Sequence, residues 1–377
     1  MIYRQLGKTA LRVSALGFGA MRLPMVNIGG EDYVDLDRAV DCLRYGFEKG
    51  INYVDCGFLY CAKESEIAVG RALRGWRDKV TVTTKATKFG MKNPGDLRRM
   101  LEHQLRKMEL DWFDFYCFHG IGWDNFHEID AKTGWQRDLF HAKDEGLVKR
   151  IGFSFHDAPE NMKKLIDLGF FEMVTCQYNY LDTKNEEPMA YAAEKGLGVA
   201  VMGPVGGGRL AGLPKPIADE LGISTTYTAE LPLKFVLSNP HVSVALSGMG
   251  SRQMVDENVA VAASGETLSE AEREQLRRLT ARMGKMAELY CTGCGYCMPC
   301  EHGVSIPRRF ELMNYDRVFG LSEYARDQYA KLRLEEAGKE GGGLCVECRT
   351  CEGKCPQKVP IVEQLQETEQ ALSVRRA

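Results

Sequence analysis

Residues 35–55, DLDRAVDCLRYGFEKGINYVD, place a helical pattern directly before a short β-rich run. Apolar residues in the first part recur three and four positions apart, as on one face of an amphipathic helix, and Gly50 stands where a glycine often ends a helix. The second part, INYVD, is a run of strand-forming residues that ends on Asp55. A helix followed at once by a strand is the repeating unit of α/β proteins, so this stretch predicts that class.

The same unit repeats from Val13 to about Arg282. Helical segments such as SEIAVGRALRGW at 65–76 and PGDLRRMLEHQLRKM at 94–108 separate the strand-like runs. Eight units predict a (β/α)8 TIM barrel. A doubly wound sheet is the alternative, but the G-x-G-x-x-G that should follow its first strand is missing, because the sequence there reads GFGAM. The eight runs are VSALGFGA at 13–20, INYVD at 51–55, VTVTTK at 80–85, FDFYCFH at 113–119, VKRIGFS at 148–154, MVTCQYN at 173–179, LGVAVMG at 197–203 and VSVALSG at 242–248.

Eight of the thirteen cysteines form two runs near the C-terminus. The second run, followed by Pro356, has the C-x2-C-x2-C-x3-C-P spacing of bacterial ferredoxins with two 4Fe–4S clusters. In those proteins the fourth cysteine of each run ligates the other cluster. The spacing therefore predicts that Cys291, Cys294, Cys297 and Cys355 hold cluster 1, and that Cys345, Cys348, Cys351 and Cys300 hold cluster 2.

Disulfides and structural zinc are two other uses of closely spaced cysteines. A disulfide framework suits a small secreted protein, whereas this chain of 377 residues can bury a core without cross-links. Structural zinc takes four ligands, usually in two separated pairs, and does not need a third cysteine at the same spacing. The scattered cysteines are predicted to be small buried hydrophobic residues; they are Cys42, Cys56, Cys61, Cys117 and Cys176.

Two segments flank the barrel pattern. The opening residues, IYRQLGKTALRV, indicate a hairpin that turns at Gly7 and Lys8. More than forty residues with helical patterns separate the cysteine runs, and 362–377 has the pattern of a final amphipathic helix. We therefore expect a barrel domain at 1–282 and a small helical ferredoxin-like iron–sulfur domain at 283–377.

Composition favours a cytoplasmic protein. The formal net charge of −3 implies no nucleic-acid or membrane-surface partner. No apolar run approaches the roughly 18 residues that span a bilayer, and the first residues lack the apolar region of a signal peptide. Iron–sulfur clusters and many free thiols also suit a reducing compartment.

Polar side chains stand at or just beyond the ends of consecutive predicted strands. They are Asp55, Tyr60, Lys85 and His119, and the C-terminal ends of barrel strands form the catalytic face of TIM barrels. We expect Asp55 to orient the cation of Lys85, and Lys85 to lower the pKa of Tyr60 from about 10. Tyr60 could then donate a proton to a carbonyl oxygen that His119 also binds. The alternative is a structural ion pair beside a surface tyrosine.

With these residues in place, the sequence resembles the aldo-keto reductase family over about its first 265 residues. The resemblance is carried by LGFGAMRLP, Asp55-x4-Tyr60, TTKA around Lys85, FYCFHG around His119, IGFSFH, CQYNYLD and the late ENV. With CTGCGYCMPC and the following GVSIP, the chain is similar to the ferredoxin-type subgroup. The resemblance implies that the four strand-end residues are the catalytic tetrad of NAD(P)H-dependent carbonyl reduction or alcohol oxidation.

The resemblance also implies cofactor contacts. Ser154, His156 and Gln177 lie where the family binds the nicotinamide amide, and Gly203 or Met202 takes the place of a ring-stacking tyrosine. The glycine run at 206–208 would let the backbone approach a pyrophosphate, although a flexible loop is the alternative. Positions at the adenosine end are Gly248, Ser251, Arg252, Glu257 and Asn258.

Cofactor preference and the role of the clusters stay open. Gly248 and Met249 replace a common Lys-Ser pair, so Ser251 and Arg252 are the local candidates to bind a 2′-phosphate. NADP, NAD and a flavin in the same phosphate site are all retained. The clusters could be structural, could sense redox state on an inactive barrel, or could pass electrons between a flavin and a ferredoxin-like partner.

The predicted substrate is a small carbonyl compound or alcohol. The loop GIGWDNFHEIDAKTGW at 120–135, after His119, is the main candidate for substrate specificity. Trp123, Phe126 and Trp135 could form an aromatic wall at the barrel mouth. The alternative is that the three side chains form a packed core within the loop.

Overall fold

The computed structural model describes residues 1–29, 31–208, 210, 229–282, 291, 293–317, 322–338 and 341–373, without the side chains of 279–282. The chain divides into two compact units. The first comprises Met1–Val205 and Ala229–Ser269, and the second comprises Gly206–Thr228 and Glu270–Ala377. Helix α11 (Glu270–Arg282) groups with the second unit. The domain limits expected from the sequence, 1–282 and 283–377, stay a prediction.

Eight parallel strands of the first unit close into a barrel in the order β10-β11-β12-β3-β6-β7-β8-β9. The (β/α)8 TIM-barrel prediction is confirmed, and each of the eight strand-like runs contributes one strand. The strands are β3 (Leu16–Gly19), β6 (Tyr53–Asp55), β7 (Thr81–Thr87), β8 (Phe113–Ile121), β9 (Val148–Phe155), β10 (Met173–Gln177), β11 (Gly198–Met202) and β12 (Val244–Ser247).

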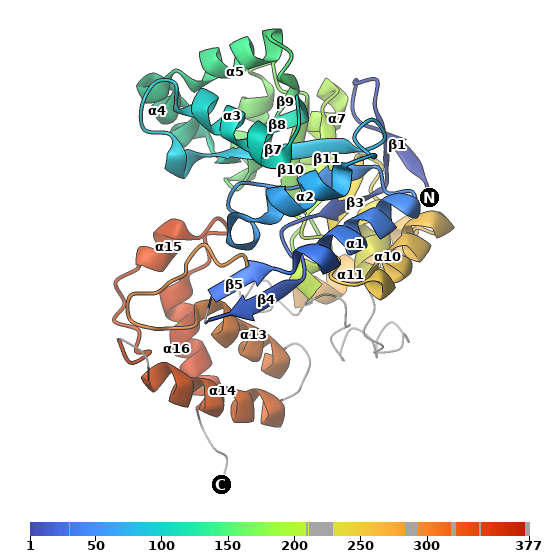
Figure 1. Cartoon of the computed structure of the whole chain (residues 1–377). Coiled ribbons are helices and arrows are strands. Elements are labelled where there is room, and N and C mark those ends of the chain that lie inside the picture. Colours follow the sequence, from blue (N-terminus) through green and yellow to red (C-terminus); the bar gives the residue numbers. More distant parts are fainter. Residues whose placement is uncertain are drawn as a thin grey trace. The chain divides into compact units, whose positions relative to one another are not determined.

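Helices of the same unit lie around the outside of these strands (Figure 1). In α1, the Asp35 side chain accepts the first-turn N–H of Arg38 at 3.3 Å, and Gly50 follows the helix with a positive φ. The sequence predicted both the helix and this glycine. The helices are α1 (Leu36–Glu48), α2 (Ser65–Leu73), α3 (Asp96–Met108), α4 (Trp123–Thr133), α5 (Trp135–Asp144), α6 (Pro159–Ile166), α7 (Glu186–Lys195), α9 (Glu230–Leu237) and α10 (Arg252–Ser264).

Two antiparallel hairpins extend the barrel. The predicted first hairpin is confirmed, as β1 (Tyr3–Gln5) pairs with β2 (Arg12–Ser14). The run at 13–20 is therefore divided between this hairpin and barrel strand β3, because the chain changes direction at Ala15. A second hairpin, β4 (Met25–Ile28) with β5 (Glu31–Val34), lies between β3 and α1 and was not predicted.

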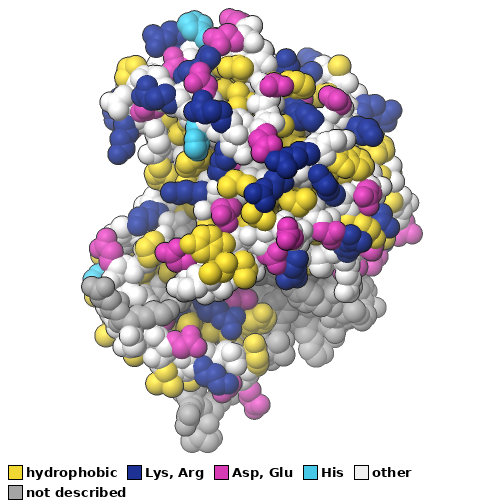
Figure 2. All heavy atoms as spheres, viewed as in Figure 1, with side chains coloured by type: hydrophobic (Ala, Val, Ile, Leu, Met, Phe, Trp, Pro, Cys, Tyr) yellow, Lys and Arg dark blue, Asp and Glu magenta, His cyan; other side chains and the backbone are white. Residues whose placement is uncertain are grey.

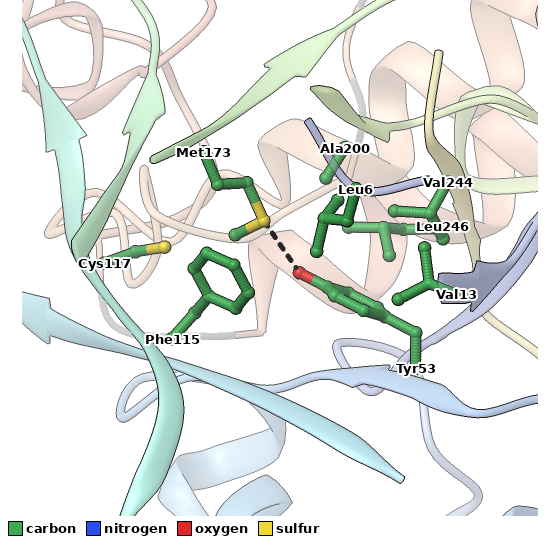
Figure 3. Packing of buried hydrophobic residues seen from close by; sticks show 9 residues of the cluster. All are labelled: Leu6, Val13, Tyr53, Phe115, Cys117, Met173, Ala200, Val244 and Leu246. Atoms are coloured by element: carbon green, nitrogen blue, oxygen red, sulfur yellow. Dashed lines mark hydrogen bonds between the residues drawn. The ribbon is translucent and has the colours of Figure 1, made fainter. Parts of the chain in front are cut away.

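The barrel interior contains a cluster of buried side chains (Figure 3). Tyr53 lies among them with its hydroxyl 2.7 Å from Thr83 Oγ1 and 3.2 Å from the sulfur of Met173. Leu6 and Val13 of the first hairpin belong to the same cluster, so the hairpin fills part of the barrel core. This packing anchors the strands whose other ends carry the candidate active site.

The second unit is helical in its described part, as the sequence predicted. Helix α13 (Ile306–Arg317) packs against α14 (Ser322–Ala337) and α16 (Ile361–Leu372), and α15 (Thr350–Lys354) precedes α16. The final helix expected at 362–377 ends at Leu372, and residues 374–377 lie outside the described residues. The core between these three helices consists of Leu312, Met313, Ala325, Tyr329, Leu332 and Leu372.

Charges of both signs are interspersed over the face drawn in Figure 2, in keeping with the small net charge. Among the described residues, no helix combines the length and the apolar character that a membrane crossing requires.

Gly7 offers a test of how the first hairpin is attached to the barrel. Its φ is +56°, and an added Cβ would lie 2.4 Å from the backbone nitrogen of Gly198. We expect Gly7→Ala to lower the free energy of unfolding by about 2–5 kcal/mol, from left-handed strain and collision together. Gly29→Ala is the matched control, because Gly29 has a φ of +65° but open space around it. It should cost only about 1–2 kcal/mol. Equal losses for the two variants in urea unfolding followed by tryptophan fluorescence would contradict this account.

Candidate active site and cluster sites

Three of the four candidate catalytic side chains lie at one rim of the barrel. Asp55 is the last residue of β6, while Lys85 and His119 lie near the ends of β7 and β8. The strand register places Lys85 beside Cys117 and His119 beside Thr87. Between Phe118 and Ile121, the stretch that contains His119, the pairing of β8 with β9 shifts, and irregularities of this kind are common next to active sites.

Lys85 is buried and paired. Its Nζ donates a hydrogen bond to Asp55 Oδ1 and another, at 2.8 Å, to the carbonyl oxygen of Cys56. Burial alone would lower the pKa of Lys85, but the carboxylate of Asp55 outweighs burial and raises that pKa. The lysine is therefore a fixed cation. The other carboxylate oxygen, Asp55 Oδ2, is buried without a hydrogen-bond partner among the described residues.

Tyr60 reaches the same rim from the loop after β6. Lys85 Nζ lies 4.9 Å from the centre of the Tyr60 ring, and a Cβ on Gly57 would stand 3.3 Å from that ring. The three residues that follow Tyr60, which are Cys61, Ala62 and Lys63, all have positive φ. Such backbone is strained for non-glycine residues and is concentrated at functional sites. The loop therefore adopts an energetically unfavourable backbone conformation where it holds Tyr60 against Lys85.

The pKa of Tyr60 differs from the sequence-based expectation. Burial raises it to about 12, although Lys85 acts to lower it. The expected direction of the lysine's effect was right, but the expected net fall below 10 was wrong, because only 8% of the side chain is exposed. In the free protein the phenol therefore keeps its proton at neutral pH.

His119 completes the group. Its ring centre lies 5.6 Å from that of Tyr60, and the two rings are nearly perpendicular. Burial lowers the pKa of His119 well below its usual value, and the cations of Lys85 and Lys88 add to this. The imidazole is therefore neutral at pH 7. A neutral imidazole can still donate one hydrogen bond to an oxygen atom.

A buried polar network behind Lys85 was not predicted. Glu66, on α2, accepts hydrogen bonds from Thr84 at 2.6 Å and from Gln104 at 2.5 Å, and it pairs with Lys107 at 2.9 Å. Gln104 also donates to the backbone oxygen of Lys85 at 3.1 Å. The network fixes β7 at the residue that carries the cation. Its only sequence signal is an acidic residue on the apolar face of a helix.

Four residues expected at the nicotinamide lie at the ends of the next strands. Ser154, in β9, accepts the N–H of Gly120 at 2.8 Å, and His156 follows the same strand. Burial lowers the pKa of His156 to about 4. A Cβ on Gly203 would meet the amide of Gln177 at 2.5 Å, so the absence of a side chain lets Gln177 take its position. His119, Ser154, His156, Gln177 and Gly203 thus follow one another along the rim.

Residues expected at the pyrophosphate and adenosine differ in environment. Gly206 and Gly207 have left-handed φ, and their place relative to the barrel is not determined. Gly248 follows β12, where an added Cβ would lie 3.2 Å from Arg22 Cβ. The hydroxyl of Ser251 caps α10 by accepting the N–H of Met254 at 3.2 Å.

Helix α10 carries the last three predicted contacts. Arg252 is exposed and already paired, since its guanidinium donates to Asp41 at 2.8 Å. Glu257 is exposed, whereas Asn258 is buried and donates to Ser247 Oγ at 2.9 Å. The guanidinium of Arg252 therefore has a carboxylate partner on α1.

The segment after His119 forms helix α4 and the start of α5. Phe126 and Trp135 are both buried, with ring centres 5.1 Å apart, and Trp135 also contacts Phe118 at 4.7 Å. Trp123 contacts His127 instead. Phe126 and Trp135 therefore belong to a packed core, the second of the two alternatives for this loop.

Cysteines of the two runs surround two hollows in the second unit. The first cavity is lined by Cys291, Cys294, Cys297 and Cys355. Burial, followed by the proximity of the other three cysteines, raises the pKa of Cys297 to about 12. The remaining walls are mostly apolar, with Ile306, Pro307, Phe310, Pro356, Val359 and Ile361.

The second cavity is lined by Cys300, Cys345, Cys348 and Cys351, and Cys297 lines both cavities. Its rim is more polar and includes His302, Arg349 and Lys354, and Cys348 is exposed. Within the described residues, no three His, Cys, Asp or Glu side chains are placed to hold a single metal ion. The four sulfur donors around each hollow suit a cluster with several iron atoms.

Two sequence families match the two parts of this chain. The Aldo/keto reductase family matches residues 15–281, and the 4Fe-4S dicluster domain matches residues 290–360. L-Galactose dehydrogenase from Arabidopsis thaliana is 29% identical over 311 residues, which cover 74% of this chain and 96% of that protein.

Solved structures resemble the barrel. An aldo-keto reductase from Bacillus halodurans in its holo form has a TM-score of 0.62 at 27% identity and covers 74% of this chain and 96% of its own. An aldo/keto reductase from Klebsiella pneumoniae, solved in complex with NADP and acetate, has a TM-score of 0.59 at 26% identity, with coverages of 74% and 95%.

The buried pair can be tested without an activity assay. In Asp55→Asn the lysine loses its counter-charge, and burial then lowers the pKa of Lys85 below its usual 10.5. We expect a fall of more than one unit, measured by NMR on protein labelled at the lysine Cε. Asp114→Asn is the control, because Asp114 pairs with Arg77 at 2.8 Å and should leave Lys85 unchanged. If the pKa of Lys85 were unchanged in both variants, Asp55 would not be the group that keeps Lys85 charged.

Proposed function

This chain belongs to the aldo/keto reductase family, and we propose that its barrel transfers hydride between NAD(P)H and a small carbonyl compound or alcohol. Asp55, Tyr60, Lys85 and His119 are proposed to act as the catalytic residues. The observation that carries this proposal is the contact of a buried, charged lysine with a buried, protonated tyrosine.

In the reduction, a bound nicotinamide supplies hydride to the carbonyl carbon. Tyr60 donates its phenolic proton to the carbonyl oxygen, since a pKa of about 12 keeps that proton in place at neutral pH. Lys85 stabilises the negative charge that then develops on the tyrosine oxygen. Asp55 keeps Lys85 charged and oriented, and the neutral His119 donates a hydrogen bond to the substrate oxygen.

The nucleotide is assigned to the same rim. Ser154, His156, Gln177 and Gly203 are proposed to bind the nicotinamide end, which agrees with their positions on consecutive strands. At the other end, the pairing of Arg252 with Asp41 leaves NAD and NADP both open, because a 2′-phosphate would have to compete with that carboxylate. The remaining proposed contacts, from pyrophosphate to adenosine, are Gly206, Gly207, Gly248, Ser251, Glu257 and Asn258.

Each cavity of the second unit is proposed to hold one 4Fe–4S cluster. Cys291, Cys294, Cys297 and Cys355 are assigned to the first, and Cys345, Cys348, Cys351 and Cys300 to the second. Such clusters supply one-electron transfer when bound. Their presence is consistent with work in a reducing cytoplasm.

Electron transfer through the clusters is a second candidate function. The observation that favours it is the exposure of Cys348, which would bring the second cluster close to solvent and to a ferredoxin-like partner. Hydride moves two electrons together, so this candidate also requires a group that can split the pair, most often a flavin.

Replacement of Tyr60 tests the first candidate. We expect Tyr60→Phe to lower kcat for reduction of a small aldehyde by about 10²–10⁴-fold, because the phenyl ring has no proton to donate. The binding of NAD(P)H, followed by its fluorescence, should change little. Tyr191→Phe is the control, since this half-buried tyrosine of helix α7 donates a hydrogen bond to Asp167, outside the group of candidate catalytic residues. Full activity in Tyr60→Phe would exclude the tyrosine as proton donor.

Stopped-flow absorption distinguishes the two candidates. If the clusters turn over, mixing the reduced protein with substrate should change the cluster absorption at the rate of turnover. A constant cluster spectrum during turnover would leave the clusters a structural or sensing role. Analysis of the same sample for iron, sulfide and flavin shows whether it contains a flavin. A flavin could connect two-electron hydride transfer with one-electron transfer through the clusters.

A further inference from the structure

A buried ion pair lies in the helical insert between the cysteine runs. Arg309, on α13, and Glu336, on α14, are almost completely buried. The guanidinium donates to Glu336 Oε2 at 2.6 Å from Nη2 and at 3.2 Å from Nε. Burying two charges costs more than their attraction returns unless the remaining donors and acceptors are also bonded.

The remaining hydrogen bonds of this ion pair reach two segments. One follows the first cysteine run, and the other precedes the second run. Glu336 Oε1 accepts the backbone N–H of Ser305 at 2.6 Å, five residues after Cys300. Arg309 Nη2 donates to the backbone oxygen of Gly343 at 2.7 Å, two residues before Cys345. One ion pair therefore holds both chain segments that lead to the second cavity.

Two glycines show how closely the segment before Cys345 is packed. Gly341 and Gly343 both have positive φ. A Cβ on Gly341 would lie 2.5 Å from the Cα of His302, and one on Gly343 would lie 2.4 Å from the Cβ of Glu336. His302 itself lines the second cavity. At these two positions the segment fits against the cavity wall and the ion pair without room for a side chain.

We propose that Arg309 and Glu336 are positioning residues for the second cluster, so that loading of the second cavity depends on this ion pair while loading of the first does not. The inference rests on the proposed function, because it takes the two cavities to be cluster sites. Neither Arg309 nor Glu336 lines either cavity. They act by fixing the distance between Cys300 and Cys345, which come from different runs.

The first cavity is held by other contacts. Cys355 is bonded through its N–H to the backbone oxygen of Glu352 at 3.1 Å, and the side chain of Glu352 accepts the N–H of Val362 at 2.9 Å. Apolar side chains form most of the remaining wall of the first cavity. Release of the Gly343 segment would therefore leave the four cysteines of the first cavity near their positions.

A matched pair of glycine variants tests the proposal in the full chain. Gly343→Ala drives a Cβ into Glu336, whereas Gly342→Ala has a similar φ of +62° and nothing within 4 Å. We expect iron to fall from about eight to about four atoms per chain in Gly343→Ala and to stay at about eight in Gly342→Ala. Iron and acid-labile sulfide are measured after anaerobic purification, with electron paramagnetic resonance of the reduced protein.

A charge variant tests the ion pair itself. Glu336→Gln keeps the shape of the side chain but removes the closer of the two carboxylates beside Arg309, which leaves only Glu369 at 3.5 Å. The same loss of about four iron atoms is expected. Arg308→Gln is the control, because Arg308 on the same helix forms a partly exposed ion pair with Glu311. We expect the Arg308→Gln protein to keep all of its iron.

Double variants identify which cluster is lost. Adding Cys348→Ser to Gly343→Ala should remove no further iron, whereas adding Cys294→Ser should remove most of what remains. Full iron in both Gly343→Ala and Glu336→Gln would overturn the proposal, as would equal loss from both cavities together with loss of helical circular dichroism. Failure of the proposed cofactor itself is distinguishable, because the unmodified chain would then lack cluster iron.

Discussion

Closure of eight parallel strands is the constraint on which the candidate active site depends. It brings the ends of β6, β7 and β8 to one rim, so residues thirty positions apart in sequence become neighbours. Lys85 and Asp55 then meet in a place from which water is largely excluded, and the lysine keeps its charge only because the carboxylate is there. The strained loop after Tyr60 and the network around Glu66 are both arranged around this pair.

The periodic pattern of the chain was enough to predict the barrel, because strands buried on both faces and amphipathic helices have distinct sequence signatures. Strand ends also identified Asp55, Lys85 and His119 as neighbours, since parallel strands present their ends at one rim. What could not be predicted depends on burial. The pKa of Tyr60 is set by how far its ring is withdrawn from water. The β4–β5 hairpin and the packing of Trp135 against Phe118 depend on pairing between segments, which gives no periodic signal in the sequence.

Cysteine spacing predicted more than a metal site. Because the fourth cysteine of each run was assigned to the other run, the spacing implied that Cys300 lies near Cys345 and Cys355 near Cys291. The structure places these same groups around the two cavities. The spacing could not predict what holds the runs together, because Arg309 and Glu336 have the appearance of ordinary surface residues on charged helices. Their burial follows from packing among α13, α14 and α16, which local sequence does not specify.

Two buried ion pairs among the described residues, Asp55–Lys85 and Glu336–Arg309, illustrate two uses of the same interaction. Around Arg309 and Glu336, both carboxylate oxygens accept hydrogen bonds. Glu336 accepts the backbone N–H of Ser305 and Arg309 donates to the backbone oxygen of Gly343, so the pair is bonded to two other segments, as a fixed structural joint requires. In the barrel, Asp55 Oδ2 has no partner among the described residues, and Lys85 lies against a titratable ring. Since a buried ion pair contributes little net stability, its retention is best explained by what it positions. A fully bonded pair resists change, whereas an incompletely bonded pair beside a phenol is poised to respond when charge develops on that phenol.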